Sequence, residues 1–246
     1  MTTMYCEDKE PFVPQKILAI GAHPDDIDFG ASGAIAAWVK DGAHVEYLVV
    51  TDGSKGSPDL SMTSQQLIQT RQDEQRDAAQ TLGVADVHFL AYEDGALEVT
   101  QALKKDIVRV IRQVRPDTVI TLDPTMVYSS QLGIVNHPDH RATGQATLDA
   151  LYPLARDHLS FPDLLTEEKL EPHKVAHVLL IHFGKHDCLV DISGTLDLKL
   201  AALMQHVSQI PDTDKAREFV TSMAANIGKT AHVPYAEGFI RLDLPR

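Results

Sequence analysis

The feature that most limits the fold is a repeat of apolar run, helix-like segment and apolar run near the start of the chain. Lys16–Gly21 (KILAIG) has the length and apolarity of a fully buried strand, and so does most of His44–Thr51 (HVEYLVVT). Between them, Phe29–Lys40 carries apolar residues on roughly one face, with Asp28 as the candidate N-cap. A strand, a helix and a strand within about 35 residues are typical of a βαβ unit, which predicts two parallel strands.

The same alternation continues toward the C-terminus. It predicts further strands over 87–90, 118–122, 175–183 and 189–192, and further helices over 64–82, 100–114, 138–151, 196–207 and 214–225. Loops are expected over 53–62 and 123–138. We therefore expect a Rossmann-like α/β fold, a three-layer sandwich with a mostly parallel sheet and helices on both faces. The length predicts a single domain over 1–246, with 1–14 as a polar N-terminal extension.

Charge and cysteine content limit the partners and the compartment. The chain has 35 acidic and 22 basic residues and a formal net charge of −13, which argues against nucleic acid or an anionic membrane as the main partner. No segment reaches the ~18 apolar residues of a membrane span, and the acidic start has no signal-peptide core. Cys6 and Cys188 predict no disulfide framework, so we expect a reducing, cytoplasmic location.

Acidic side chains and imidazoles follow the predicted strands. His23-Pro24-Asp25-Asp26 follows the first strand, Thr51-Asp52 the second and Glu93-Asp94 the third. Asp123, and then the loop that ends in His137-Pro138-Asp139-His140, follows the fourth. Ligands bind at the carboxyl ends of the strands in open parallel sheets. The sequence therefore predicts a polar site at one edge of the sheet.

The motifs HPDD (23–26) and HPDH (137–140) have the composition of a catalytic metal site. Imidazole nitrogen and carboxylate oxygen are zinc ligands, and His23 with Asp26 can reach one ion from one side. Either His137 or His140 would be the third ligand, which leaves a position open for water. Asp25 would then act as general base on that water. The other histidine of HPDH would stabilise the oxyanion or protonate the leaving group, and Asp139 would orient its ring.

Each motif also has a simpler interpretation. HPDD alone could be a strand-to-helix turn in which proline sets the bend and aspartate caps the helix. HPDH alone could be a capped helix start, with Asp139 as N-cap and exposed histidines. The presence of both motifs at strand ends of one sheet favours the metal site over two unrelated caps.

The chain resembles the PIG-L/LmbE family of zinc-dependent N-deacetylases over nearly its whole length. The matching segments occur in order: AHPDDIDFGASG, VVTDGSKGS, TRQDEQRDAAQTLGV, TLDP, NHPDHRATG, LVDIS, AALMQHVSQ and YAEGF. The resemblance implies that His23, Asp26 and His140 bind one zinc ion, that Asp25 is the general base and that His137, tuned by Asp139, assists the oxyanion and leaving group. Arg71 and Asp94 match positions that hold substrate hydroxyls in sugar-processing members.

The implied activity is removal of an acetyl group from an N-acetylglucosamine-type sugar or conjugate. Iron or cobalt would fit the same ligands, and the resemblance allows a homo-oligomer. Some members carry a carbonyl-polarising tyrosine where this chain has Val135 and Asn136, and Tyr128 in the same loop is a candidate replacement. Arg71 could instead pair with Glu74, one helical turn away, and Asp94-Gly95 could be a simple turn.

Three other functions fit the residues. A metal hydrolase of this kind could cleave a phosphoester or a non-sugar N-acyl amide. A non-catalytic α/β protein could hold a structural metal, although a structural site has no use for Asp25 beside an open coordination position.

Overall fold

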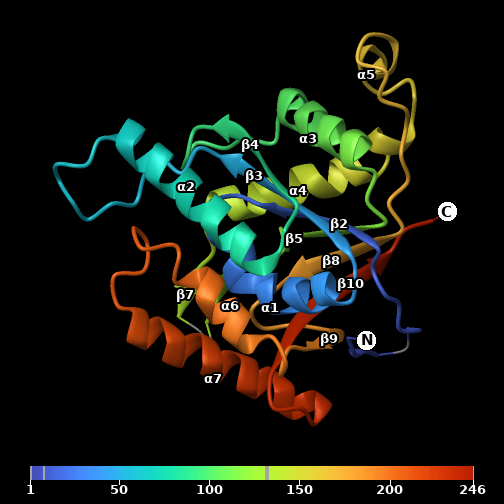
Figure 1. Ribbon diagram of the computed structural model, residues 1–246. Helices are drawn as coiled ribbons and strands as arrows, with labels where there is room; N and C mark the ends of the chain where they lie inside the picture. The colour runs from blue at the N-terminus through green and yellow to red at the C-terminus, as the bar shows by residue number, and fades with distance from the viewer. Residues whose placement is uncertain (1, 8, 131–132, 246) are drawn as a thin grey trace.

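The computed structural model describes residues 2–7, 9–130 and 133–245. A central sheet lies between two layers of helices (Figure 1). Its strands lie in the order β1-β9-β10-β8-β5-β2-β3-β4. Their bounds are β1 Met4–Cys6, β2 Lys16–Gly21, β3 His44–Thr51, β4 Asp86–Tyr92, β5 Thr118–Leu122, β8 His177–Ile181, β9 Cys188–Asp191 and β10 Ala236–Asp243.

The helices divide into two layers. On one face of the sheet lie α1 (Asp26–Lys40), α2 (Ser64–Leu82), α6 (Leu196–Leu203) and α7 (Thr213–Ala231), which share one apolar core with the strands. On the other face, α3 (Gln101–Val114) and α4 (Pro138–Leu151) form a second core. Two short elements, η1 (Leu154–Arg156) and α5 (Pro162–Thr166), follow α4. The predicted three-layer α/β fold with a mostly parallel sheet is confirmed.

The strand order reverses beside β2. This strand lies between β3 and β5 and is parallel to both. From β2 the chain moves outward through β3 to β4, and then crosses back to β5 and on to β8, all in parallel. The carboxyl ends of β2 and β5 therefore flank a topological switch point, where open α/β sheets bind their ligands.

Most predicted boundaries match the structure, and the start of α1 does not. The helix α2 has a capping box at Thr63 and ends at Gly83, whose φ of 78° is the left-handed conformation that glycine tolerates. In contrast, α1 begins at Asp26 with Asp25 at the N-cap. The prediction of Asp28 as N-cap is therefore wrong: Asp28 lies inside the first turn and is fully buried.

The far edge of the sheet contains two strands that the sequence did not predict. The strand β10 lies antiparallel between β8 and β9, and β1 pairs with β9, so part of the predicted N-terminal extension belongs to the sheet. The predicted loop 123–138 contains a short hairpin, β6 (Tyr128–Ser129) and β7 (Ile134–Val135), and its residues 131–132 lie outside the described part. The helix α6 ends earlier than predicted and α7 continues to Ala231.

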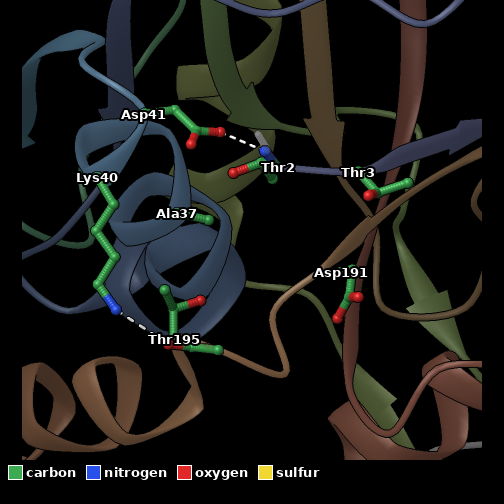
Figure 2. Close-up of a pocket in the computed structure, with 8 residues that line it drawn as sticks. Thr2, Thr3, Ala37, Lys40, Asp41, Asp191 and Thr195 are labelled. Carbon is green, nitrogen blue, oxygen red and sulfur yellow. Dashed lines mark hydrogen bonds between the residues drawn. The ribbon is translucent and has the colours of Figure 1, made fainter.

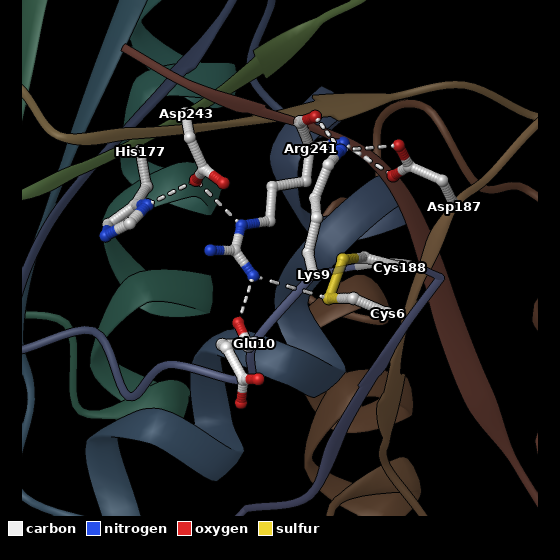
Figure 3. Close-up of a disulfide and its surroundings, with 8 residues drawn as sticks. All are labelled: Cys6, Lys9, Glu10, His177, Asp187, Cys188, Arg241 and Asp243. Carbon is white, nitrogen blue, oxygen red and sulfur yellow. Dashed lines mark hydrogen bonds and ion pairs between the residues drawn. A yellow bond between two sulfur atoms is a disulfide. The ribbon is translucent and has the colours of Figure 1, made fainter. Parts of the chain in front are cut away.

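The prediction that Cys6 and Cys188 form no disulfide framework is wrong. Cys6 and Cys188 stand opposite each other in the β1–β9 pair and form a disulfide, beside which the Arg241 guanidinium lies 3.7 Å from Cys6 Sγ (Figure 3). This bond removes the argument for a reducing compartment, so the cytoplasmic location stays a prediction. No helix in the described ranges has both the length and the apolarity needed to cross a membrane.

Candidate functional site

The turn after β2 fixes the carboxylate of Asp26 with its own backbone. Asp26 Oδ2 accepts hydrogen bonds from the backbone N–H groups of Ala22 and His23, at 2.9 and 2.8 Å. The other oxygen, Oδ1, lies 3.0 Å from His140 Nε2, and Oδ2 lies 3.5 Å from His23 Nδ1. HPDD therefore aims one carboxylate at both predicted histidine ligands.

The helix α4 brings HPDH to the same place. His137 is its N-cap and Pro138 its first residue, where a missing N–H costs nothing. A Cβ on Gly144 would lie 2.2 Å from the backbone oxygen of Leu122, so only glycine allows α4 to approach the end of β5 this closely. The close contact places His140 opposite Asp26.

Asn136 determines which nitrogen of His140 is free. Asn136 Oδ1 lies 3.0 Å from His140 Nδ1, and its Nδ2 donates to the carbonyl of Met126 at 2.7 Å. Because Asn136 presents an acceptor to Nδ1, a proton belongs there, and Nε2 is the nitrogen that faces Asp26, 3.0 Å from its Oδ1. This is how the outer partner of a metal-binding imidazole selects its tautomer.

The opposite side of the His23 ring faces two further carboxylates. His23 Nε2 lies 3.1 Å from Asp94 Oδ1 and 3.2 Å from Asp139 Oδ2. Asp139 is itself held by the N–H groups of Gly95 and Leu97. Burial disfavours a charged His23 ring, but hydrogen bonds to the surrounding carboxylates, first among them Asp139, outweigh it and raise its pKa to about 12.

These side chains fit a divalent metal ion. One ring nitrogen each of His23, His137 and His140 lie within 4.8 Å of one another, beside the Asp26 carboxylate. Burial opposes ionisation of Asp26, but the charge of His140 and hydrogen bonds to both neighbouring rings lower its pKa well below the usual range. An ionised carboxylate among converging imidazoles is the donor set of catalytic zinc sites.

Asp25 lies in a different environment from its neighbour. Its carboxylate is 3.5 Å from the Arg71 guanidinium, whereas Asp26 supplies the carboxylate oxygen that lies 3.0 Å from His140 Nε2. Burial, and then the charge of Asp26, raise the pKa of Asp25 to about 6 despite Arg71. A carboxylate with a pKa near neutrality is suited to accept and return a proton.

His137 is held by backbone more than by the carboxylate predicted to tune it. Its Nδ1 accepts the backbone N–H of Asp139 at 3.3 Å, whereas the Asp139 carboxylate is 3.9 Å away. Burial and the charge of His23 lower the pKa of His137. The ring is therefore neutral near pH 7 and carries its proton on Nε2.

Arg71 and Asp94 are both 5% exposed and are engaged with the protein. The Arg71 guanidinium donates to the carbonyls of Pro24, Gly53 and Lys55, and Asp94 accepts the N–H of Lys55. Their predicted contacts with substrate stay predictions. Glu74 does not form the alternative pair with Arg71, because both of its carboxylate oxygens accept hydrogen bonds from Ser208.

Sequence reasoning missed two residues that contact the site. Asn136 directly precedes HPDH, at a place where some family members carry a tyrosine, and it contacts His140. Gln75 lies in RQDEQ and its Oε1 accepts the backbone N–H of Asp25 at 3.0 Å. Tyr128, the candidate tyrosine replacement, lies on β6 opposite Val135 with a side chain that is 69% exposed.

Two other features lie away from this site. Glu46, Asp86 and His88 form an acidic and imidazole group at the amino ends of β3 and β4, at the opposite edge of the sheet. Figure 2 shows a pocket of about 250 Å³ at the C-terminal end of α1, where Lys40 donates to the carbonyl of Gly194. Asp25 is at the other end of this helix, so the pocket is separate from the candidate site.

Known proteins that are similar to this chain are N-deacetylases. The family model "PIG-L: GlcNAc-PI de-N-acetylase" matches residues 18–151. A diacetylchitobiose deacetylase of Thermococcus kodakarensis is 34% identical over 93% of this chain and 84% of its own length. A 1D-myo-inositol 2-acetamido-2-deoxy-alpha-D-glucopyranoside deacetylase of Kineococcus radiotolerans is 27% identical over 82% of this chain and 71% of its own.

A solved structure gives the same result. The N,N'-diacetylchitobiose deacetylase of Pyrococcus horikoshii, in complex with its inhibitor MPG, superposes with a TM-score of 0.85 and 32% identity, over 94% of this chain and 84% of the other. The matched range contains HPDD and HPDH, the two motifs that the fold brings together. The chain therefore belongs to the PIG-L/LmbE family of N-deacetylases.

Proposed function

We propose that this protein is a zinc-dependent N-deacetylase that releases acetate and a free amine from an N-acetylglucosamine-type sugar or conjugate. The observation that carries the proposal is the separation of two adjacent carboxylates. Asp26 faces His23 and His140, while Asp25 is turned toward Arg71. The sugar class is supported by the relatives, whose names specify acetylated glucosamine in a disaccharide or an inositol conjugate.

We propose His23, Asp26 and His140 as the ligands of one zinc ion, and a single domain over 1–246. A bound zinc ion would polarise the acetyl carbonyl and lower the pKa of a water molecule at its open position. The two carboxylates around His23 Nε2, from Asp94 and Asp139, would hold that ring as it binds through Nδ1, the nitrogen nearer Asp26.

Asp25 would carry the proton, and His137 would stabilise the oxyanion beside the leaving group. Asp25, with its raised pKa of about 6, is ionised near neutral pH and takes a proton from the attacking water. His137 is neutral and presents Nε2–H, because its Nδ1 accepts from the backbone. It can therefore donate a hydrogen bond to the developing oxyanion, and the proton that the leaving amine requires is the one that Asp25 took from the water.

The other predicted residues, Arg71, Asp94 and Asp139, lie beside Asp25 and His23. Arg71 and Asp94 are proposed as contacts for sugar hydroxyls from the resemblance alone, since the structure shows them bound to backbone groups of the surrounding loops. Asp139 supports HPDH through its backbone N–H to His137 and its carboxylate to His23.

The test combines metal analysis with acetate release. Metal content of the purified protein is measured first, and acetate is then assayed with diacetylchitobiose, N-acetylglucosamine and small N-acetylglucosaminides. We expect Asp25→Asn to retain its metal and lose about 10²- to 10⁴-fold in kcat. The matched control is Asp73→Asn, an exposed change on α2.

Three results would contradict the proposal. If the fully metal-loaded protein releases acetate from none of these sugars, the proposed sugar class is excluded. Turnover of other N-acyl amides would then identify a non-sugar amide as the substrate. Phosphate release without acetate release would identify a different reaction. An Asp25→Asn variant as active as Asp73→Asn would remove the proposed general base.

A further inference from the structure

A chain of buried hydrogen bonds ends at the backbone of Asp25. Gln75 of α2 accepts the N–H of Asp25 through Oε1, at 3.0 Å, and donates from Nε2 to Asp28 Oδ2, at 2.8 Å. His206, in the segment after α6, lies with its Nε2 2.9 Å from the same Asp28 oxygen. Gln75, Asp28 and His206 are each 0% exposed, so these bonds form without competition from water.

These contacts join two sequence segments through residues that have no role in the proposed mechanism. Gln75 belongs to RQDEQ on α2, and His206 and Ser208 belong to HVSQ after α6. A second contact runs beside the first: Glu74 accepts from both the N–H and the hydroxyl of Ser208, at 2.7 Å each. Two segments more than a hundred residues apart are thus tied together directly behind HPDD.

The backbone of Asp25 has a conformation that needs external support. Its φ is 108°, a left-handed value that non-glycine residues rarely adopt. Such residues persist where the surrounding structure determines them, and they concentrate at functional sites. The side chain of Asp25 makes no capping hydrogen bond to α1, which holds this residue through its backbone carbonyl, the acceptor of the Phe29 N–H at 3.0 Å.

We propose that Gln75 is the positioning residue for Asp25, and that Asp28 and His206 orient Gln75 for this task. The inference rests on the proposed function, in which Asp25 is the general base. An amide side chain presents an acceptor at one end and a donor at the other, and only one orientation suits both neighbours. Asp28 offers acceptors to Nε2, so Oε1 is directed to the N–H of Asp25.

The link explains how Asp25 stays separate from Asp26. The N–H of Asp25 points to Gln75 on α2, and with φ at 108° its carboxylate lies 3.5 Å from Arg71. The carboxylate of Asp26 lies instead 3.0 Å from His140. If the link is lost, the peptide between Pro24 and Asp25 keeps the Arg71 bond to its carbonyl but loses the partner of its N–H. The strained φ then relaxes toward a negative value, and the carboxylate moves away from the water that it must deprotonate. The ligand Asp26 is unaffected, because its Oδ2 accepts from the backbone N–H groups of both Ala22 and His23.

The experiment replaces Gln75 by a side chain of similar length without polar ends. Gln75→Met is compared with Gln80→Met, an exposed change on the same helix. Metal content, thermal stability, kcat and KM for diacetylchitobiose are measured on the metal-loaded proteins, and the crystal structure of Gln75→Met is determined. We expect kcat to fall about 10- to 100-fold, with KM within about threefold, metal content unchanged and Asp25 displaced.

Several outcomes would overturn the inference. A Gln75→Met protein that is less stable but has wild-type kcat would show that Gln75 only packs the core. Loss of metal would show that the link supports the ligands and not the base. If Gln75→Met does not fold, the same measurements are made on Gln75→Asn. The asparagine amide is one methylene too short to bridge both Asp25 and Asp28. A wild-type kcat in this variant would contradict the proposal.

The crystal structure separates this inference from the proposed function. If the wild-type protein releases acetate from no sugar, the function fails, but the position of Asp25 in the variant still tests the link. An Asp25 that keeps its positive φ and its distance to Arg71 without Gln75 overturns the positioning role, whatever reaction the protein performs.

Discussion

Substitution of Gly144 by alanine tests whether the close approach of α4 to β5 assembles the site. Gly144 lies in the helix that carries His137 and His140, one turn beyond the latter. A Cβ there would lie 2.2 Å from the backbone oxygen of Leu122 and 3.0 Å from Pro124 Cδ. Both obstacles belong to the end of β5 and the loop after it, and a backbone oxygen cannot rotate away.

The size of the effect follows from the contact distance. An ordinary contact begins at 3.4 Å, so α4 and the end of β5 must separate by about 1.2 Å. In an open helical position the change would stabilise the protein by about 1 kcal/mol, because alanine favours helix more than glycine does. Overpacking costs about 1–3 kcal/mol, so we expect a net loss of stability. A displacement of about 1 Å at a catalytic group lowers the rate about 100-fold.

The assay compares two glycines with similar clashes. In Gly228→Ala, on α7, the new Cβ would lie 2.6 Å from the backbone oxygen of Val233, away from the site. We expect both variants to melt at lower temperature in calorimetry. Only Gly144→Ala should lose metal affinity, measured by competition with a chelator, and about 100-fold in kcat/KM for acetate release.

The comparison can refute the reasoning in two ways. If Gly144→Ala is destabilised yet keeps wild-type metal affinity and kcat/KM, the site does not depend on this approach of α4. If Gly228→Ala loses as much activity as Gly144→Ala, the losses reflect stability in general and not the position of His140.

Three further predictions concern separate parts of the molecule. Asn136→Leu removes the acceptor at His140 Nδ1, so metal affinity should fall about 10- to 100-fold in chelator competition, and an unchanged affinity would remove Asn136 from the site. Cys6→Ser opens a covalent link between residues 182 apart and should cost about 2–5 kcal/mol of unfolding free energy; a reductant should destabilise the wild type and leave the variant unchanged. Burial opposes ionisation of Glu46, but hydrogen bonds from His88 and His44 outweigh it and lower the pKa of Glu46 from 4.5. The ionised carboxylate therefore stabilises the folded protein above pH 4.5, and this stabilisation is lost as the pH falls through the lower pKa of the folded state. Glu46→Gln should therefore weaken urea resistance at neutral pH only, and equal loss in acid would contradict this sign.

The sequence predicted the half of the sheet that carries the site, for a physical reason. Strands buried between two helix layers appear as short apolar runs, and the bounds of β2, β3 and β5 match those predicted. The strand β10 (AEGFIRLD) was missed because polar residues interrupt it. Glu237 is 4% exposed because Lys199 and two backbone N–H groups of α1 satisfy its carboxylate. Only the folded chain supplies such partners.

The disulfide was missed for a similar reason. Cys6 and Cys188 carry no spacing signal, and their pairing depends on the register of β1 against β9. The sequence predicted a strand over 189–192, which is β9, but the three-residue strand β1 is too short to be recognised. The pairing of the two strands therefore could not be predicted. Cysteine content alone predicts a reducing location, so the predicted compartment depended on the same unseen pairing.

The two carboxylates of HPDD show most clearly where local sequence is sufficient and where it is not. The position of Asp26 is determined within its own turn, by N–H groups three and four residues earlier, so the motif alone predicts a carboxylate aimed at one point. The position of Asp25 depends on Gln75, 50 residues away, and on a backbone conformation that no local pattern indicates. The motif therefore identifies a pair of acids, and the contact with α2 gives the two acids different surroundings. A sequence that kept HPDD and HPDH but lost the Gln75 contact would be expected to bind the metal and to turn over slowly.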